Sequence, residues 1–365
     1  RSTHTQSRRQ RQMCIRDSTG TFHENYAQEM AILSSRGQWV IVAVLLVFIF
    51  ACPLFLSDRM LTILTTMGIA VVSVHGLNIL TGYCGQISIG HSGFMAVGGY
   101  TSAILCAKLG WPFWAALPCG ALAAGIAGLL FGLPSLKIKG FYLIMATIAA
   151  QFIIIWIIIQ LRSITGGTDG LLVPKPTIGG IGLSSKINYY YLVMVFAVLA
   201  TITAHNIIRT RAGRAFIAIR DNDLAAEVMG VSLWSYKLQA FFIGCIYAGV
   251  AGSLLVHYVR FASIEQFPFW DSVMYLGMLI VGGMGSTAGA IFGVVALKVL
   301  DELVTVAGPI LAAAVAPQAA ASLALISHGM IIIIFLIFEP RGLHHRWEMI
   351  RSYFRLWPFS HQETE

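Results

Sequence analysis

The sequence predicts an all-α polytopic membrane protein, with about eight to ten transmembrane helices and a glycine-broken segment in each half. Of its 365 residues, 57% are hydrophobic and only 11% are charged, whereas soluble domains carry roughly 25% charged residues. The apolar stretches are continuous runs near the length of about 20 residues that a spanning helix needs. They do not alternate as the strands of a β-barrel do, and a helix satisfies its backbone hydrogen bonds internally in lipid.

The chain divides into three parts by composition. Residues 1–37 are polar, and residues 1–18 lack the apolar core of a signal peptide, so we expect those 18 to be non-native. Residues 38–343 hold the apolar runs and are expected to form the membrane domain, with a cytoplasmic loop at residues 209–237. Residues 344–365 are expected to form a basic cytoplasmic tail.

The apolar runs follow one another with short polar breaks. They are Trp39–Leu56, Met60–Leu80, His91–Leu109, Pro112–Phe131, Phe141–Leu161, Tyr189–Ile208, Leu238–Tyr258, Val273–Leu300, Leu303–Ala324 and Ile326–Phe338. Val273–Leu300 is interrupted by glycines and is expected to form two short segments. Leu303–Ala324 is weakly apolar, and Ile326–Phe338 is short. Glycine and alanine recur every four residues in several runs, as in Gly244, Ala248 and Gly252, which favours close helix packing.

The basic residues predict the orientation, because cytoplasmic loops of membrane proteins are enriched in Lys and Arg. With the N-terminus inside and ten crossings, the inner loops hold eleven basic residues and the outer loops seven. The inner set is Lys137, Lys139, Arg209, Arg211, Arg214, Arg220, Lys237, Arg341, Arg346, Arg351 and Arg355; the outer set is Arg59, Lys108, Arg162, Lys175, Lys186, Arg260 and Lys298. This distribution, rather than nucleic-acid binding, explains the net charge of +8.

The loop Arg209–Lys237 is predicted to contain an amphipathic helix. Asp221, Asn222 or Asp223 is a suitable N-cap, and Gly230 is a suitable end point. We expect an apolar stripe of Ala225, Ala226, Met229 and Val231, and a polar face of Arg220, Asp221, Asp223 and Glu227. Such a helix either docks into a groove of a partner protein or lies on the membrane surface, and the residues alone leave both open.

The first glycine-broken segment is Gly82–His91. Unwound backbone is tolerated in a membrane only where protein or a water-lined cavity satisfies it. A helix that starts near His91 would present free amides to a carboxylate, and Gln86 and Ser88 add polar groups. The alternative is a packing role for the glycines. A second broken segment lies at Gly282–Gly293, and paired breaks in two halves indicate a transport pathway.

The outer loop Thr165–Gly170 is predicted to form a tight turn in which Asp169 bonds local amides; the alternative is a contact for an external partner. The chain lacks a phosphate-binding G-x-x-x-x-G-K-[ST] motif. Its six cysteines have no metal-ligand spacing, and no nucleophile–base arrangement is apparent, so we predict no catalytic residue and no metal site. We also expect no Asp or Glu inside the confident spans, which disfavours an ion-coupled carrier.

Five stretches carry a resemblance to a known family. They are LNILTGYCGQISIGHSGFMAVGGYTSAIL (Leu77–Leu105), TGGTDGL (Thr165–Leu171), AIRDNDLAAEVMGVSLWSYKLQAF (Ala218–Phe241), GGMGSTAGAIFG (Gly282–Gly293) and FEPRGL (Phe338–Leu343). In this order they resemble the membrane permease subunit of ATP-binding-cassette importers for branched-chain amino acids. The likeness runs from about Thr19 to about Leu343.

The resemblance implies a transport subunit that is not an enzyme and carries no cofactor. A homologous second permease would share the translocation path within the lipid of the bacterial inner membrane. Two cytoplasmic subunits would bind and hydrolyse ATP, and a periplasmic binding protein would deliver leucine, isoleucine or valine. The ATPase-coupling residues are then expected to be Arg220, Asp221, Asp223, Ala226, Glu227 and Gly230. The substrate path is expected to include Gly85, Gln86, Ser88, Gly90, His91, Phe94, Gly282, Gly283 and Gly285.

Two other functions remain open at this point. A sister importer for urea or short amides would have the same architecture. The sequence GQISIGH favours the amino-acid importers over this group, but it does not identify the substrate. A secondary carrier that works alone is a different class of transporter. A membrane scaffold without transport is disfavoured by the paired breaks.

Overall fold

The computed structural model describes residues 36–135, 140–178, 181–182, 185–315 and 342–356, together with positions 329, 330, 333 and 337. The chain forms two compact units, Arg1–Leu56 and Ser57–Glu365. In the first unit, α3 (Arg36–Ala51) is followed by the 3-10 turn η1 (Cys52–Leu54). The second unit holds every other described element, and the expectations for residues 1–18, Lys137, Lys139 and Arg341 lie outside the described residues.

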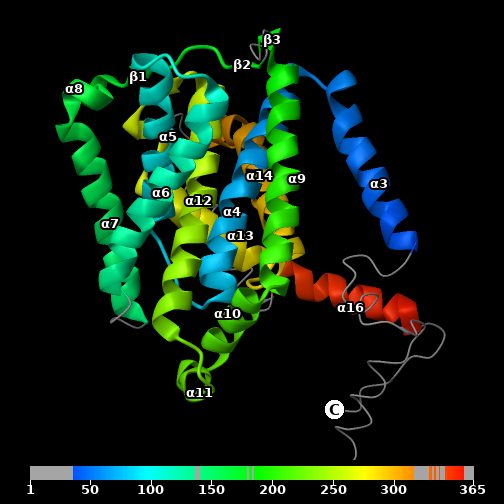
Figure 1. Cartoon of the computed structure of the whole chain (residues 1–365). Helices are drawn as coiled ribbons and strands as arrows, with labels where there is room; N and C mark the ends of the chain where they lie inside the picture. Colours follow the sequence, from blue (N-terminus) through cyan, green and yellow to red (C-terminus); the bar gives the residue numbers. More distant parts are fainter. Residues whose placement is uncertain are drawn as a thin grey trace, which may run out of the picture. The chain divides into compact units, whose positions relative to one another are not determined.

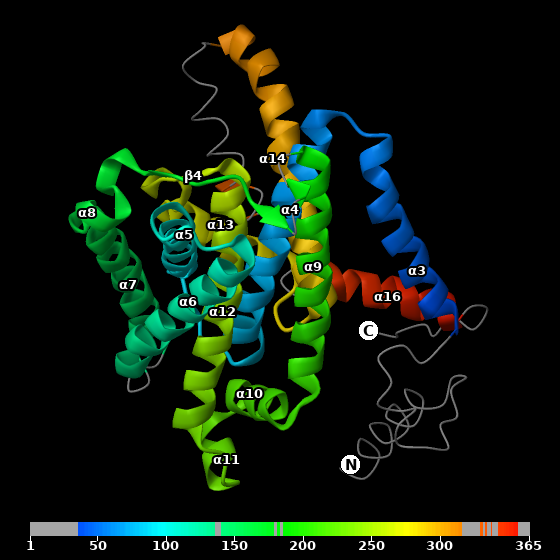
Figure 2. The same ribbon diagram turned by 45° about the horizontal axis from the view of Figure 1, so that its top comes forward.

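The second unit is a helical bundle (Figures 1 and 2). Its long helices are α4 (Asp58–Leu77), α5 (His91–Lys108), α6 (Phe113–Ser135), α7 (Phe141–Gln160), α9 (Lys186–Arg209), α12 (Leu233–Val259), α13 (Phe269–Gly282) and α14 (Thr287–Val315). Shorter elements are the π-helix η2 (Asn78–Tyr83), α8 (Arg162–Thr165), η3 (Gly167–Asp169), α10 (Arg211–Asp221), α11 (Asp223–Val228), η4 (Ile264–Gln266) and α16 (Leu343–Leu356). Among the described residues, five helices are long and apolar enough to cross a membrane, or six when the bent pair α13–α14 counts as one span. The all-α polytopic class is therefore confirmed.

Helix α12 lies at the centre of the bundle and packs on α4, α5 and α6. Small residues bring the backbones together: a Cβ added to Gly98 would lie 2.3 Å from the Cα of Gly249, and one added to Gly252 would lie 2.0 Å from the carbonyl oxygen of Met95. Lipid tails are as apolar as the helices, so the close van der Waals packing between these backbones, rather than a hydrophobic force, favours their association. Side chains such as Leu77 and Leu254 are fully buried in this core.

Four two-residue strands lie at the end of the bundle opposite α10 and α11 (Figures 1 and 2). Strand β1 (Leu171–Leu172) pairs antiparallel with β4 (Phe261–Ala262), so that Leu171 faces Ala262. Strand β2 (Thr177–Ile178) pairs with β3 (Ile181–Gly182). The strand pairs satisfy backbone groups of loops that leave the helical region.

The basic residues separate between the two ends. Lys186 pairs with Asp58 at 3.0 Å, and Arg59 pairs with Glu302, at the end that carries the strands. The loop from Arg209 to Lys237 lies at the other end (Figure 1). Two expectations are corrected in α14: Lys298 lies inside this helix rather than in a loop, and the helix continues from Thr287 to Val315 without a break at Leu303. The helix starts at Thr287, and the apolar residues on both sides of Asp301 allow it to continue past that residue.

Two acidic residues that the sequence placed outside the run Val273–Leu300 belong to the bent pair α13–α14. Asp271 is in the first turn of α13, and Asp301 is in α14, within a bent helix pair apolar enough to cross a membrane. The sequence boundary at Val273 was placed one helical turn too late. Asp271, Lys298 and Asp301 line a cavity of about 250 Å³ together with Trp270, Met274, Tyr275, Met278 and Leu297.

Candidate functional site: the glycine junction and the loop helices

The loop Arg209–Lys237 forms two helices instead of the single helix predicted. The hydroxyl of Thr210 caps α10 by accepting a hydrogen bond from the amide of Gly213 (3.3 Å). Asn222 adopts an extended backbone that breaks the helix, and its side-chain oxygen accepts from the amide of Ala225 (3.1 Å) to start α11. Of the three N-cap candidates it is therefore Asn222 that caps. Gly230 follows α11 with φ of +84°, a left-handed conformation that favours glycine.

The apolar surface of α11 is different from the predicted stripe. Ala226 is buried, and Val231 packs on the core. Met229 is exposed, and so are Leu224 (65% exposed) and Val228 (88% exposed). We call Leu224, Val228 and Met229 the α11 apolar tip. Three exposed large apolar side chains, two on this short helix and one directly after it, favour a partner surface over bulk water.

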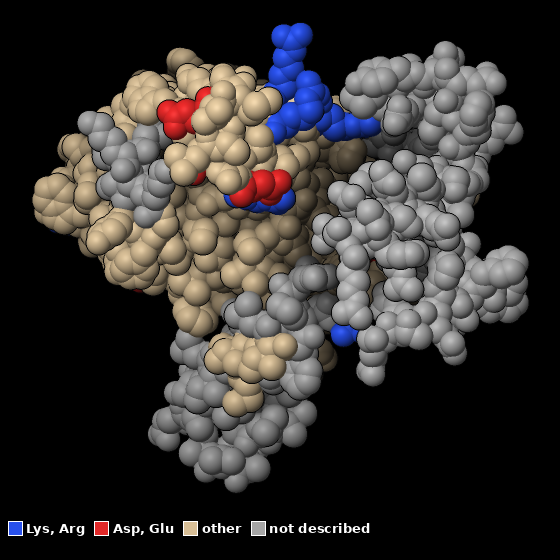
Figure 3. Space-filling view, turned by 90° about the horizontal axis from the view of Figure 1, so that it is seen from below, with Lys and Arg blue, Asp and Glu red and all other residues tan. Residues whose placement is uncertain are grey.

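The loop also carries charged residues, and Figure 3 shows acidic and basic side chains on the face of the molecule at this end. Asp223 pairs with Lys237 at 3.6 Å, which holds α11 against the start of α12. Glu227 is exposed and borders a groove of about 460 Å³ with Gly230, Val231, Ser232, Leu233, Trp234 and Lys237. Asp221 and Gly230 are exposed as well. The predicted coupling residues therefore lie together at one end of the bundle, except that Ala226 is buried and Arg220 turns inward.

The Arg220 side chain points back toward the bundle. Its Nη1 donates to the carbonyl oxygen of Gly82 at 3.0 Å. Its Nε and Nη2 both donate to Oδ1 of Asp221, at 3.2 and 3.1 Å. The guanidinium presents its donors in a fixed planar fork, so Asp221 orients the group that reaches Gly82.

The first glycine-broken segment is confirmed as a break between two helices. Helix α4 ends in the π-helix Asn78–Tyr83, the chain is unwound from Cys84 to Gly90, and α5 starts at His91. Gly85 has φ of +74°, which lets the chain turn. The hydroxyl of Thr81 donates to the carbonyl of Gln86 at 3.0 Å, so protein groups satisfy the unwound backbone.

The start of α5 is enclosed by polar side chains from other helices. The amide of Ser92 donates to the hydroxyl oxygen of Ser272 (2.8 Å), and that hydroxyl donates to the Gln151 amide oxygen (2.6 Å). His91 is buried, with its ring Nε2 3.0 Å from the carbonyl oxygen of Ser73. Within the described residues, four buried polar atoms here have no hydrogen-bond partner: Oε1 of Gln86, Oγ of Ser88, Oγ of Ser92 and Nε2 of Gln151.

The second break lies between α13 and α14, directly against the first. The side-chain oxygen of Asn78 accepts from the amide of Gly285 (3.0 Å), and its nitrogen donates to the carbonyl of Ser286 (2.9 Å). Gly283 and Gly285 have φ of +111° and +78°. A Cβ on Gly342 would lie 2.5 Å from the Cα of Gly283, so the FEPRGL stretch also ends here. We call this meeting point of Asn78, Gly82, Gly85, Gly283 and Gly285 the glycine junction.

The predicted path residues do not all share this place. Gly85, Gly283 and Gly285 belong to the junction, and Gly282 is buried beside it, where an added Cβ would lie 2.0 Å from the carbonyl oxygen of Gly289. Gly90 is buried against the backbone of Thr147. Phe94 is a core residue, 1% exposed, and its ring lies 6.4 Å from those of Phe131 and Phe241. Asn78 was missed as a site residue; its only sequence signal was a polar amide within an apolar run.

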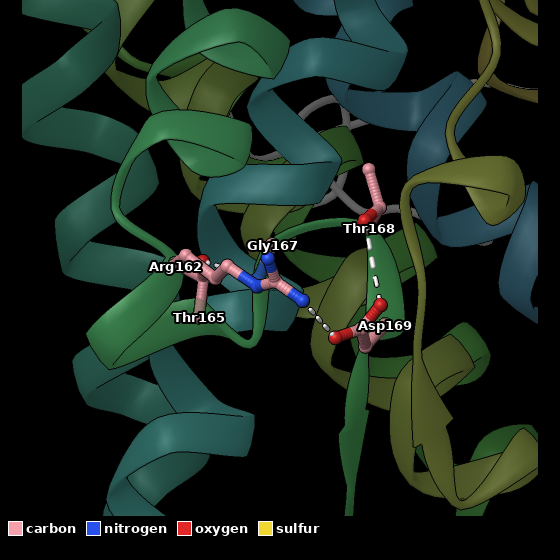
Figure 4. Close-up of polar contacts among 5 residues, drawn as sticks. All are labelled: Arg162, Thr165, Gly167, Thr168 and Asp169. Carbon is pink, nitrogen blue, oxygen red and sulfur yellow. Dashed lines mark hydrogen bonds and ion pairs between the residues drawn. The ribbon is translucent and has the colours of Figure 1, made fainter.

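The outer loop after α7 forms the predicted turn with a different partner for its carboxylate (Figure 4). Asp169 accepts from the Arg162 guanidinium at 2.6 Å and from the Thr168 hydroxyl at 3.5 Å, rather than from backbone amides. The amide of Gly167 instead donates to the Thr165 hydroxyl at 3.1 Å. The hydrogen bond and the positive charge of Arg162 hold the pKa of Asp169 below its ordinary value.

Comparison with known proteins identifies the family. Residues 59–336 match the family model for the branched-chain amino acid transport system / permease component. The chain belongs to this family. Its glycine junction and loop helices all lie within the matched residues. Because the family consists of permease components of a transport system, this chain is a membrane-embedded transport subunit that works with other subunits.

Individual relatives agree with the family. The chain is 31% identical to the high-affinity branched-chain amino acid transport system permease protein LivM of Escherichia coli K12, over 84% of this chain and 75% of that protein. It is 30% identical to the Salmonella typhimurium LivM over the same shares. A probable branched-chain amino acid transport permease protein LivM of Methanocaldococcus jannaschii is 24% identical over 60% of this chain and 64% of that protein. No solved structure matches the chain.

Proposed function

We propose that this chain is the membrane permease subunit of an ATP-driven importer for branched-chain amino acids. The observation that carries the proposal is the family match over residues 59–336, supported by LivM relatives aligned over 84% of the chain. A leucine-like substrate needs polar groups for its ammonium and carboxylate and an apolar surface for its side chain. The importer chemistry then divides between this chain, which forms the path, and partners that supply energy.

The energy-coupling partners contact the loop helices in this proposal. The α11 apolar tip is exposed at the end of the bundle where Figure 3 shows charged side chains. A short helix with an apolar tip suits a groove in a partner protein. We assign this groove to the cytoplasmic ATP-binding subunits, so the loop end is cytoplasmic and the strand end faces the periplasm across the inner membrane. ATP is bound and hydrolysed in those subunits, and this chain holds no cofactor.

The substrate path is proposed to pass the unwound segment and the start of α5, with the second permease opposite. The unpaired polar atoms of Gln86, Ser88, Ser92 and Gln151 support this, because buried polar groups without partners are costly and are retained where a ligand or water binds. The helix N-terminus adds a positive partial charge that suits a carboxylate. Phe94 is left out of the path, because it is buried in the core.

Reconstitution tests the proposal. The chain is purified with the permease, ATPase and binding-protein subunits encoded beside it, placed in proteoliposomes and supplied with ATP and labelled substrate. We expect ATP-dependent leucine uptake that needs the binding protein. Uptake of urea without leucine would assign the chain to the sister importers instead. Gradient-driven uptake by this chain alone would replace the importer subunit with a secondary carrier.

A further inference from the structure

The cytoplasm-assigned loop and both glycine-broken segments are connected by two long-range side chains. Arg220 on α10 bonds the carbonyl of Gly82 across 138 positions of sequence. Asn78 bonds Gly285 and Ser286 across 207 and 208 positions. These bonds meet at the glycine junction, because a Cβ on Gly285 would lie 2.6 Å from Nη1 of Arg220 and one on Gly82 would lie 2.0 Å from Oδ1 of Asn78.

We propose that Asn78 and Arg220 form a link that transmits movement of the loop helices to both broken segments at once. In this assignment the Arg220 side chain, which is 37% exposed, acts as a positioning residue through its bond to Gly82 and not as part of the surface that contacts the ATPase. The inference rests on the proposed function, since it needs an energy source that moves the loop. It goes further by naming which atoms carry the movement into the membrane.

The geometry makes the link stiff. Asp221 fixes Nε and Nη2 of Arg220, so Nη1 is directed at Gly82 and cannot rotate away without breaking three hydrogen bonds. A charge-assisted hydrogen bond of this kind is about twice as strong as a neutral one. The Asn78 side chain is 1% exposed and uses its oxygen and its nitrogen on consecutive residues of the other break. Both partners are therefore held from two sides.

The segments that the link joins are suited to move. Gly82 lies in a π-helix, an irregular helical turn found frequently at functional sites. Gly85, Gly283 and Gly285 have positive φ, so small rotations at these residues redirect the helices α5 and α14 that follow. A second contact, Tyr83 Oη to Thr287 Oγ1 at 3.4 Å, joins the same two segments. One displacement of α10 thus reaches the start of α5 and the start of α14 together.

The test uses the complete complex in proteoliposomes, with two readouts. The first is leucine transported per ATP hydrolysed, and the second is the amount of ATPase subunit that co-purifies with the permease. Arg220→Gln and Asn78→Ala should each lower the transport ratio about tenfold or more, the size expected for losing a hydrogen bond to a charged or buried group. Both variants should retain the wild-type amount of ATPase. Arg220→Lys, which keeps the charge but not the fork, should fall between.

The matched control is Arg214→Gln, which removes an arginine from the same helix. Among the described residues, the Arg214 side chain bonds the carbonyl of Arg209 at the end of α9 (3.1 Å) and no residue of the junction, so the transport ratio of this variant should stay near the wild-type value. The double variant Asn78→Ala/Arg220→Gln should be no worse than the poorer single variant, because one link is broken only once.

Three results would overturn the link. They are loss of ATPase subunits from the Arg220→Gln complex, an unchanged transport ratio in both single variants, or multiplied defects in the double variant. A wild-type complex that hydrolyses ATP without moving leucine would instead defeat the proposed function, and that outcome is read from the wild type alone.

Discussion

A methyl group added at Gly98 should loosen the contact between α5 and α12, and the structure gives the size of the effect. The new Cβ of Gly98→Ala would lie 2.3, 2.6 and 2.8 Å from the Cα, carbonyl oxygen and carbonyl carbon of Gly249. Normal carbon contacts are about 3.5–4.0 Å, so one helix must shift by roughly 1 Å. The obstructing atoms are backbone and cannot rotate away as a side chain would.

The magnitude follows from two opposed terms. Overpacking a core costs about 1–3 kcal/mol, and we place a backbone clash at the upper end. Replacing glycine by alanine inside a helix returns up to about 1 kcal/mol. The net expectation for Gly98→Ala is a loss of about 2 kcal/mol. The matched control is Gly132→Ala on α6. Its new Cβ would lie 3.3 Å from the Phe241 side chain, so this variant gains the same helix stability as Gly98→Ala with little clash.

The assay is thermal unfolding of both purified variants in the same detergent, at one scan rate because unfolding of such proteins is irreversible. A loss of 1 kcal/mol lowers Tm by roughly 2–4 °C in domains of 150–250 residues. Because both variants gain the same helix term, they differ by the clash alone, about 3 kcal/mol, and we expect Gly98→Ala to melt roughly 6–12 °C below Gly132→Ala. The packing argument fails if Gly98→Ala melts at the same temperature as the control or above it.

Three further predictions concern the loop helices, the core and the outer turn. Glu227→Lys, and Gly230→Val, which places a bulky residue in a left-handed conformation, should each reduce co-purification of the ATPase subunits while the permease still inserts. Normal association of both variants would show that the loop does not contact those subunits. Phe94→Ala should cost about 3–5 kcal/mol of stability and leave the KM for leucine unchanged in the protein that survives, and a selective rise in KM would return Phe94 to the path. Because the pKa of Asp169 is lowered, its pair with Arg162 should persist at pH values below the ordinary pKa of an aspartate and be lost as the pH falls through the lowered pKa. A carbon-13 titration of the Asp169 carboxyl measures this pKa, and Arg162→Gln should raise it. The same pKa in the variant and the wild type would contradict the pairing.

Features encoded by neighbouring residues were predictable. The start of α5 at His91 and the end of α11 before Gly230 were found because glycines and capping side chains act within one helical turn. The second predicted break, Gly282–Gly293, was found in its first part for the same reason, whereas Gly289 and Gly293 lie inside α14. Composition alone predicted the all-α membrane class, because lipid leaves few alternatives for an apolar backbone.

Features that depend on contacts between residues far apart in the sequence were not predictable. The bonds of Asn78 to Gly285 and of Arg220 to Gly82 join segments more than a hundred positions apart, and periodicity carries no information about such pairs. Arg220 therefore looked like a surface charge. The position of Asp271 was missed because an acidic residue lowers local hydropathy, which moved the predicted boundary of the span past it. Phe94 looked accessible because a glycine-rich neighbourhood does not reveal which face of α5 is buried.

The short ladder between β1 and β4 has a consequence for how the bundle opens. It ties the chain just after α8 to the chain just after α12, and a further hydrogen bond from the Val173 amide to the Arg260 carbonyl (3.1 Å) lengthens the tie by one residue. Backbone bonding holds these two connections in register at that end, whereas among the described residues the helices meet at the opposite end through side chains and glycines. If α12 tilts against its neighbours, it should therefore pivot near the ladder, and the displacement of its residues should increase toward the far end of the helix.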